Sequence, residues 1–293
     1  MNLGIDVRDA SIAAVRADGQ GTVIARSVQP GATGSAAVDA IRQVNPDLPA
    51  RVGIAVHDSA DPLVSDIIAA AAGASRAAEA PLVVTKGGAV ALAEQWLGAA
   101  RGARHVVALT ATDCVHAGIV INGGIFEGAH GFAGAAAWLA LNPVERDDYR
   151  RFGCLEAEIG ASGIVRRLVW RIKSGDTSRV LEMADGRLGD ITITQVFDAA
   201  RDGDGVAIAV VRDTARYIGM AIGNLVAIVD PDIIVLGGLM AEAADLLLEP
   251  SRAEAVRRVS PAAAPTLQIV AGLLGDEAAA LGAARAVQLD RDR

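Results

Sequence analysis

The same succession of hydrophobic patterns occurs twice along the chain, and this repetition most constrains the fold. Each half opens with short apolar segments around Asp-Gly or Asn-Gly turns, which predict a meander of strands. The first meander covers about residues 1–25 and the second covers residues 105–126. Helical periodicity and further buried strands follow each meander, and we expect helices near residues 161–173, 193–202 and 206–228. We therefore predict two α/β domains, residues 1–112 and 113–275, with a helix at 276–290 that completes the first domain.

Composition excludes several classes of protein. Of the 293 residues, 52% are hydrophobic and 21% are charged, which is typical of a globular chain. No apolar run approaches the roughly 18 residues that cross a bilayer, and the first residues do not resemble a signal peptide, so we expect a cytoplasmic protein without a membrane partner. The net charge of −8 comes without a basic stripe, so we expect no direct nucleic-acid partner. Cys114 and Cys154 lack metal-ligand spacing, and we predict no metal site.

The stretch at 83–94, VVTKGGAVALAE, presents a lysine at the end of a strand. An apolar strand near Val84, a small loop and an Ala-rich helix from Gly88 are expected here. This arrangement often presents a functional residue at the strand end, and Lys86 occupies that position.

Seven motifs along nearly the whole chain occur in the order found in one known family. They are GID at 4–6, GAHGFAG at 128–134, GCLEA at 153–157, AARDGD at 199–204, NL at 224–225 with DP at 230–231, VLGG at 235–238, and GDEAAALGAA at 275–284. On these motifs the chain resembles the ROK family of sugar kinases and sugar-responsive repressors. The resemblance implies a two-domain actin-like ATPase (ribonuclease H-like) α/β fold with an interdomain cleft, and a homo-oligomer.

The resemblance also implies a nucleotide site, which this sequence retains in part. Asp6 stands where the family keeps an acid that helps to position the metal, and Gly237 and Gly238 stand where it holds the adenosine. The two glycine-rich phosphate loops are replaced by RDA at 8–10 and TDCVH at 112–116. Side chains at these positions keep phosphate from approaching the backbone, and the new aspartates add like charge. MgATP is therefore not expected to bind in the family's usual way.

The sugar side departs from the family in a similar way. The Glu-x-Gly-His that grips sugar hydroxyls in the family is AAAW at 135–138, although Gly134 before it and Glu156 are kept. Of the family's zinc cysteines only Cys154 is present, with Asp147 and Tyr149 where two others would fall. By the resemblance, the candidate ligand pocket consists of Lys86, Asp58, Asp113, Gly134 and Glu156.

Lys86 itself stands where the resemblance places the general base. A protonated lysine cannot accept a proton from a sugar hydroxyl, so no catalytic residue is assigned. We predict that Lys86 lies within ion-pair distance of Asp9, Asp58 or Asp113. Two roles stay open for it: an ion-pair partner in a retired active site, or an anchor for a phosphate or carboxylate ligand.

Three functions follow from these observations. The first is a catalytically inactive sugar-kinase homologue, a pseudokinase, with a ligand-binding or regulatory role and no required cofactor. The alternative is a divergent ATP-dependent sugar or amino-sugar kinase, glucokinase-like, that uses ATP and Mg²⁺ and has Asp113 or Asp58 as its base. The third is a ligand-sensing repressor, although that branch carries an N-terminal winged helix-turn-helix and this chain begins directly at the first predicted strand.

Overall fold

The computed structural model describes residues 2–46, 49–57, 62–112 and 114–291, and the chain divides into two compact units. Unit 1 comprises Met1–Ala108, Ala117–Gly134 and Gly272–Arg293, and unit 2 comprises Leu109–His116 and Ala135–Ala271. The C-terminal segment therefore returns to the unit in which the chain began.

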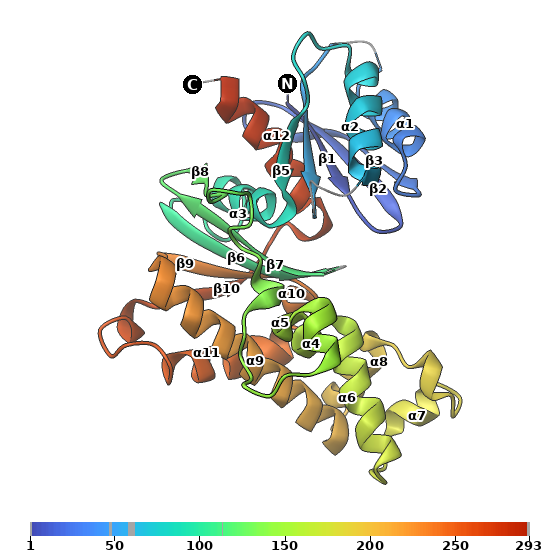
Figure 1. Cartoon of the computed structure of the whole chain (residues 1–293), viewed down its shortest axis with the longest axis vertical. Helices are drawn as coiled ribbons and strands as arrows, with labels where there is room; N and C mark the ends of the chain where they lie inside the picture. The colour runs from blue at the N-terminus through green and yellow to red at the C-terminus, as the bar shows by residue number, and fades with distance from the viewer. Residues whose placement is uncertain (1, 47–48, 58–61, 113, 292–293) are drawn as a thin grey trace. The chain divides into compact units, whose positions relative to one another are not determined.

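A five-stranded sheet in the order β3-β2-β1-β4-β5 forms the centre of unit 1 (Figure 1). Its first three strands are the predicted antiparallel meander, and β4 and β5 run parallel to β1. The carboxyl ends of β1, β4 and β5 therefore meet at one edge of the sheet. The strands are β1 Asn2–Val7, β2 Ser11–Ala17, β3 Val23–Pro30, β4 Val52–Val56 and β5 Leu82–Thr85.

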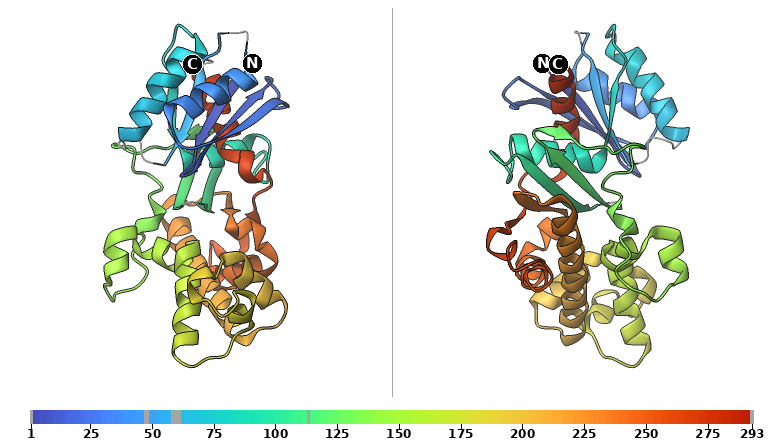
Figure 2. Two further views of the ribbon diagram at one scale, coloured as in Figure 1. Left: turned by 90° about the vertical axis from the view of Figure 1, so that its right-hand side faces the viewer. Right: turned by 60° about the vertical axis from the view of Figure 1, so that its left-hand side comes forward.

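Helices cover both faces of this sheet, with α1 and α2 on one face and α12 on the other (Figure 2). Successive strand residues point to opposite faces, and Leu3 and Ile5 join the apolar core formed with α1 and α2. α3 packs along α12. The helices are α1 Gly34–Val44, α2 Pro62–Ser75, α3 Lys86–Trp96 and α12 Ala278–Arg291.

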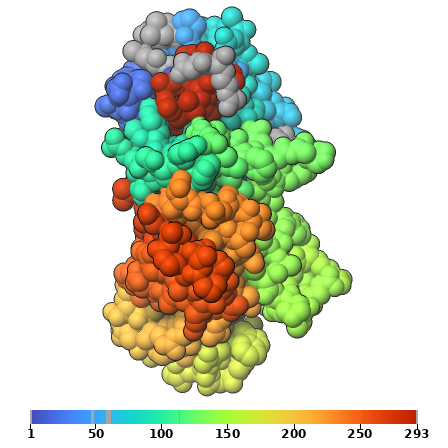
Figure 3. All heavy atoms as spheres, turned by 90° about the vertical axis from the view of Figure 1, so that its left-hand side faces the viewer, coloured from blue at the N-terminus to red at the C-terminus, as the bar shows by residue number. Residues whose placement is uncertain are grey.

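On the opposite face, two glycines let α12 lie directly against the strand backbones. Gly4 and Gly53 are register partners in β1 and β4. A Cβ at Gly4 would lie 1.9 Å from the carbonyl oxygen of Ala280, and one at Gly53 would lie 2.0 Å from that of Ala283. The C-terminal helix is thus part of the core of unit 1, and its atoms, in red, appear in Figure 3 among those of the N-terminal segments.

A second five-stranded sheet has the order β10-β9-β6-β7-β8. The predicted Asn-Gly hairpin is confirmed, because β7 and β8 pair in antiparallel fashion around Asn122 and Gly123, whose φ angles are 52° and 80°. Two positive φ angles are typical of the type I′ turn that this dipeptide favours. The strands are β6 His105–Ala111, β7 Val115–Ile121, β8 Gly124–Ile125, β9 Ile233–Gly238 and β10 Ile269–Ala271.

The helices of unit 2 are organised around α9, Gly205–Val229, which packs against α5, α6, α8 and α11. Asp204 caps its start by accepting a hydrogen bond from the backbone N–H of Ala207. The helices expected near 161–173, 193–202 and 206–228 are all present. The other helices of this unit are α4 Asp147–Phe152, α5 Cys154–Ile159, α6 Ala161–Lys173, α7 Arg179–Met183, α8 Ile193–Arg201, α10 Leu239–Glu242 and α11 Ala244–Val256. Within the described ranges, no helix combines the length and apolarity needed to span a membrane.

Candidate functional site

Strand order brings two charged residues of unit 1 together at one edge of the sheet. Asp6 is the register partner of Ala55 in β4, and Ala55 is in turn the partner of Val84 in β5. Lys86 follows two residues after Val84 as the first residue of α3. Asp6 and Lys86 therefore lie at the carboxyl ends of β1 and β5, on either side of β4.

The two side chains form a buried ion pair. Nζ of Lys86 lies 3.2 Å from Oδ1 of Asp6, and the residues are 5% and 4% exposed. The second oxygen of Asp6, Oδ2, accepts a hydrogen bond from Nε of Arg8 at 2.7 Å. Arg8 also donates to the backbone carbonyl of Asp276 at 2.6 Å. One carboxylate thus faces two cations.

This arrangement does not fit the metal role that the resemblance gives to Asp6. A Mg²⁺ ion needs free carboxylate oxygens or water in a nearly octahedral arrangement. Both oxygens of Asp6 already face cations, and the Lys86 ammonium would repel a divalent ion at the same place.

Local chemistry explains why Lys86 is held in this position. Thr85 caps α3, since its side chain accepts a hydrogen bond from the backbone N–H of Gly88 at 3.2 Å. The helix therefore begins at Lys86, two residues earlier than predicted. A Cβ at Gly87 would lie 2.5 Å from the carbonyl oxygen of Ala117, so the first turn of α3 packs closely against β7. A Cβ at Gly88 would lie 2.6 Å from the Ile125 side chain, so both glycines of the TKGG sequence have a structural role.

The structure describes Asp6 as an acidic partner of Lys86, and the expected pairing with Asp9, Asp58 or Asp113 stays a prediction. Asp9 lies in an exposed turn after β1. Asp58 and Asp113 lie outside the described residues. The partner found is Asp6, which the resemblance had assigned to metal binding.

Sequence reasoning gave no role to Glu94, which ends the VVTKGGAVALAE stretch. Its side chain is 2% exposed and accepts three backbone hydrogen bonds. Oε1 accepts from Leu273 at 2.9 Å and from Leu274 at 3.0 Å, and Oε2 accepts from Ala99 at 2.8 Å. This carboxylate therefore ties the end of α3 to the segment that leads into α12. The signal was an acidic residue that ends an otherwise apolar, Ala-rich run.

In unit 2, Glu156 lies in the first turn of α5 and accepts a hydrogen bond from the backbone N–H of Val115. Burial raises the pKa of this carboxyl group above its usual range, and the Val115 hydrogen bond opposes the shift. Glu156 thus has a structural partner of its own. Gly153 before the helix has a φ of 91°, and a Cβ there would lie 2.2 Å from the carbonyl oxygen of Ala137.

The other glycines of the predicted sites also meet backbone requirements. Gly134 lies in unit 1 with a φ of 86°, and a Cβ there would lie 2.0 Å from the carbonyl oxygen of Ala117. Gly238, with a φ of 61°, forms the turn from β9 to α10, and its Cβ would lie 2.0 Å from the carbonyl oxygen of Ala111. A Cβ at Gly237 would lie 2.7 Å from the Thr110 side chain. Close packing therefore accounts for these glycines without a nucleotide.

The residues at the family's zinc position do not fit that metal. Cys154 is a buried free thiol, and the Tyr149 hydroxyl donates a hydrogen bond to Glu158. Over the described part of the chain, no group of three or more His, Cys, Asp or Glu side chains is placed to hold a metal ion.

Comparison with known proteins identifies the family. The ROK family model matches residues 75–289. A glucokinase of Halalkalibacterium halodurans is 33% identical over 194 residues, which are 66% of this chain and 58% of that protein. The DNA-binding transcriptional dual regulator NagC of Escherichia coli is 32% identical over 160 residues, 54% of this chain and 38% of the regulator. The matches thus span less than two thirds of these relatives' own lengths.

Solved structures of the family share the fold. A ROK family glucokinase from Streptomyces griseus, in complex with glucose and AMPPNP, superimposes with a TM-score of 0.80 at 23% identity, over 97% of this chain and 98% of that one. A ROK family transcriptional regulator, a homologue of the E. coli MLC protein, superimposes with a TM-score of 0.81 at 21% identity. The match covers 98% of this chain and 77% of the regulator chain. The expected actin-like α/β fold is confirmed, and the chain belongs to the ROK family.

Proposed function

We propose that this ROK protein is a catalytically inactive relative of the sugar kinases that keeps a ligand-binding or regulatory role. The observation that carries the proposal is the buried Lys86–Asp6 ion pair at the strand ends of unit 1. Lys86 stands where the resemblance places the general base, and an ammonium group paired with a carboxylate has no free electron pair to accept the sugar proton.

The state of Asp6 supports the same conclusion. Phosphoryl transfer depends on a metal ion that neutralises the charge developing on the phosphate oxygens. Lys86 and Arg8 occupy the two oxygens of the carboxylate that would help to position this metal. Among the described residues at this edge of the sheet, neither a base at the family's position nor a free acid for the metal is present.

We propose a hexose or an N-acetylhexosamine as the ligand class. The relatives that support this choice are glucokinases and an N-acetylglucosamine repressor. Glu156 is the residue of unit 2 that the resemblance places against a sugar hydroxyl, and a carboxyl oxygen can accept a hydrogen bond from such a hydroxyl.

The alternative is a divergent ATP-dependent sugar kinase in which Asp113 or Asp58 serves as the base. It is favoured by the 33% identity with a glucokinase. In this alternative the Lys86 ammonium could contact a phosphate oxygen of ATP, and the reaction would not need Lys86 to accept a proton.

Sugar binding and sugar-dependent ATP consumption, measured on the same preparation, separate the two proposals. Binding of glucose or N-acetylglucosamine by calorimetry, without sugar-dependent ADP formation, supports the inactive protein. Turnover within the ordinary kinase range of about 1–100 s⁻¹ would overturn it. Loss of that turnover in Asp113→Asn, with Asp9→Asn as the control, would then identify the base of a divergent kinase.

A further inference from the structure

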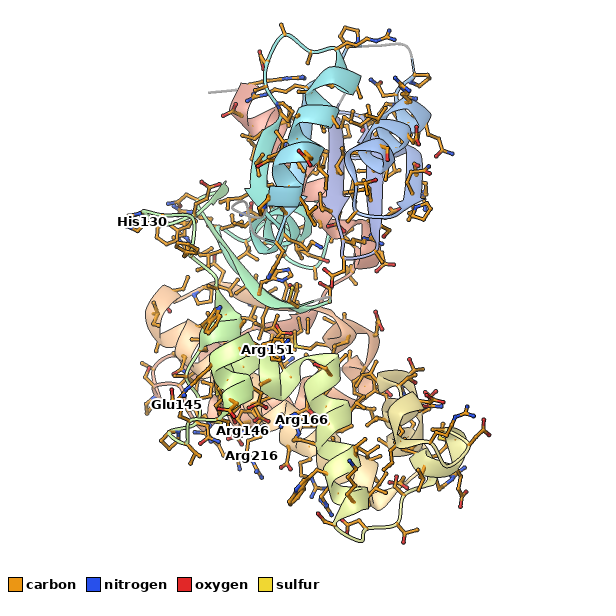
Figure 4. The ribbon with its side chains drawn as sticks, turned by 45° about the vertical axis from the view of Figure 1, so that its right-hand side comes forward. His130, Glu145, Arg146, Arg151, Arg166 and Arg216 are labelled. Atoms are coloured by element: carbon orange, nitrogen blue, oxygen red, sulfur yellow. The ribbon has the colours of Figure 1, made fainter. Side chains whose placement is uncertain are left out.

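A pocket in unit 2, apart from the Lys86–Asp6 ion pair and from Glu156, is lined by three arginines. Its volume is about 310 Å³, and Arg146, Arg167 and Arg216 line it together with Glu158, Asp213 and Tyr217. Arg146 lies just before α4, Arg167 lies on α6 and Arg216 on α9. Figure 4 labels Arg146 and Arg216, together with Arg166, the neighbour of Arg167 on α6. All of these residues belong to unit 2, so the pocket is formed within one compact unit.

The ion pairs beside this pocket contain more positive than negative charge. Glu158, which is 2% exposed, accepts from Nη1 of Arg146 at 3.0 Å and from Nη1 of Arg167 at 2.6 Å. Asp148 likewise pairs with both Arg146 and Arg166. Three guanidinium groups thus share two carboxylates, which leaves one positive charge uncompensated.

Arg167 also has a hydrogen-bond donor to spare. Its Nη1 and Nη2 donate to Glu158 and to the hydroxyl of Thr214, but its buried Nε–H has no acceptor among the described residues. A buried donor without an acceptor has lost its hydration and gained nothing in return, so such groups usually have a partner. Burial lowers the pKa of Arg167, and the neighbouring Glu158 carboxylate opposes the shift.

The remaining pocket walls suit the carbon skeleton of a small molecule. Leu141, Met220 and the ring of Tyr217 line the same space. The guanidinium carbon of Arg167 lies 6.0 Å from the centroid of the Tyr217 ring. Arg216, which also lines the pocket, is half exposed and pairs with Asp213 at 3.2 Å, so its guanidinium group can turn toward a ligand at little cost. The pocket therefore offers planar cationic donors beside apolar surface.

We propose that this pocket binds a small organic anion, a carboxylate or a phosphate monoester, whose oxygens contact Arg167 and Arg216 and whose carbon atoms pack on Tyr217. Guanidinium groups suit both kinds of oxyanion because their N–H groups match two oxygens at once. The anion would compensate the surplus charge and give the Arg167 donor an acceptor. The site is independent of the sugar ligand and of the loss of catalysis.

Calorimetric titration at low ionic strength tests the proposal, with succinate as the carboxylate probe and glycerol 2-phosphate as the phosphate probe. We expect one saturable site for at least one probe. Arg216→Gln should weaken binding at least about tenfold, the effect of one lost charged hydrogen bond. Arg212→Gln removes the same charge from an exposed position on the same helix, outside the pocket, and should leave the affinity within about twofold.

Saturable binding of one probe that is weakened only by Arg216→Gln would establish the site, and the probe that binds would name its chemistry. Absence of saturable binding for both probes would overturn the proposal, because the arginines then serve only as a structural network. Equal weakening by the two variants would also overturn it, since it would indicate general attraction of anions.

Discussion

Asp6→Asn should destabilise the protein more than Lys86→Met, although each change removes the same ion pair. At 3.2 Å and an effective dielectric constant of about 20, the pair's Coulomb attraction is about 5 kcal/mol, which desolvation largely offsets. Removing one member of a buried pair costs about 3–5 kcal/mol in general. Lys86→Met leaves Asp6 paired with Arg8 at 2.7 Å, so we expect about 2–3 kcal/mol. Asp6→Asn takes the carboxylate from two cations, so we expect about 3–5 kcal/mol.

The free energy of unfolding from urea denaturation measures both effects, and amide exchange in β1 and β5 assigns them to unit 1. The double variant should cost less than the sum of the single variants by at least about 1.5 kcal/mol, because the two residues interact directly. The control is Arg26→Gln, which breaks the exposed ion pair between Arg26 and Glu277 in the same unit and should cost under about 1 kcal/mol. Additive single effects, or an Asp6→Asn variant as stable as the wild type, would refute the ion pair as a structural element.

Three further changes test other parts of the account. The Glu94 carboxylate accepts three backbone N–H groups, and Glu94→Gln keeps only one carbonyl oxygen to accept them. The change should therefore lower the free energy of unfolding by about 1–3 kcal/mol in urea denaturation. An unchanged free energy would contradict the role of Glu94 in joining α3 to the segment before α12. Gly53→Ala should push α12 away from the sheet and lower the free energy of unfolding by about 1–3 kcal/mol or more, with a lower Tm and faster amide exchange in α12. Unchanged amide exchange in α12 would argue against direct contact between this helix and β4. Burial raises the pKa of Glu156 in the folded protein, so the wild type loses stability as the pH rises and this carboxyl group ionises. Glu156→Gln lacks this loss, so its free energy of unfolding relative to the wild type should increase from about pH 4 to about pH 8. A decrease over this range would contradict the assignment.

Local patterns predicted much of the fold. The meanders, the Asn122-Gly123 turn and the helix at Ala161–Lys173 were predicted because neighbouring residues determine their backbone conformation. The motif order along the chain supplied the family and hence the overall α/β fold.

The contacts of the candidate site depend on pairing between distant segments. Asp6 and Lys86 meet because β4 lies between β1 and β5, an order that local patterns do not specify. Glu94 binds the backbone at Leu273 and Leu274 because the C-terminal segment returns to unit 1. The arginine pocket likewise combines α5, α6, α9 and the segment before α4, so no single stretch of sequence reveals it.

The most direct test of the central claim is sugar-dependent ADP formation by the wild-type protein, with saturating MgATP and a panel of hexoses and N-acetylhexosamines. The Lys86–Asp6 ion pair predicts a rate equal to that measured without sugar. Sugar-dependent turnover of about 1 s⁻¹ or more for any sugar of the panel would contradict the account.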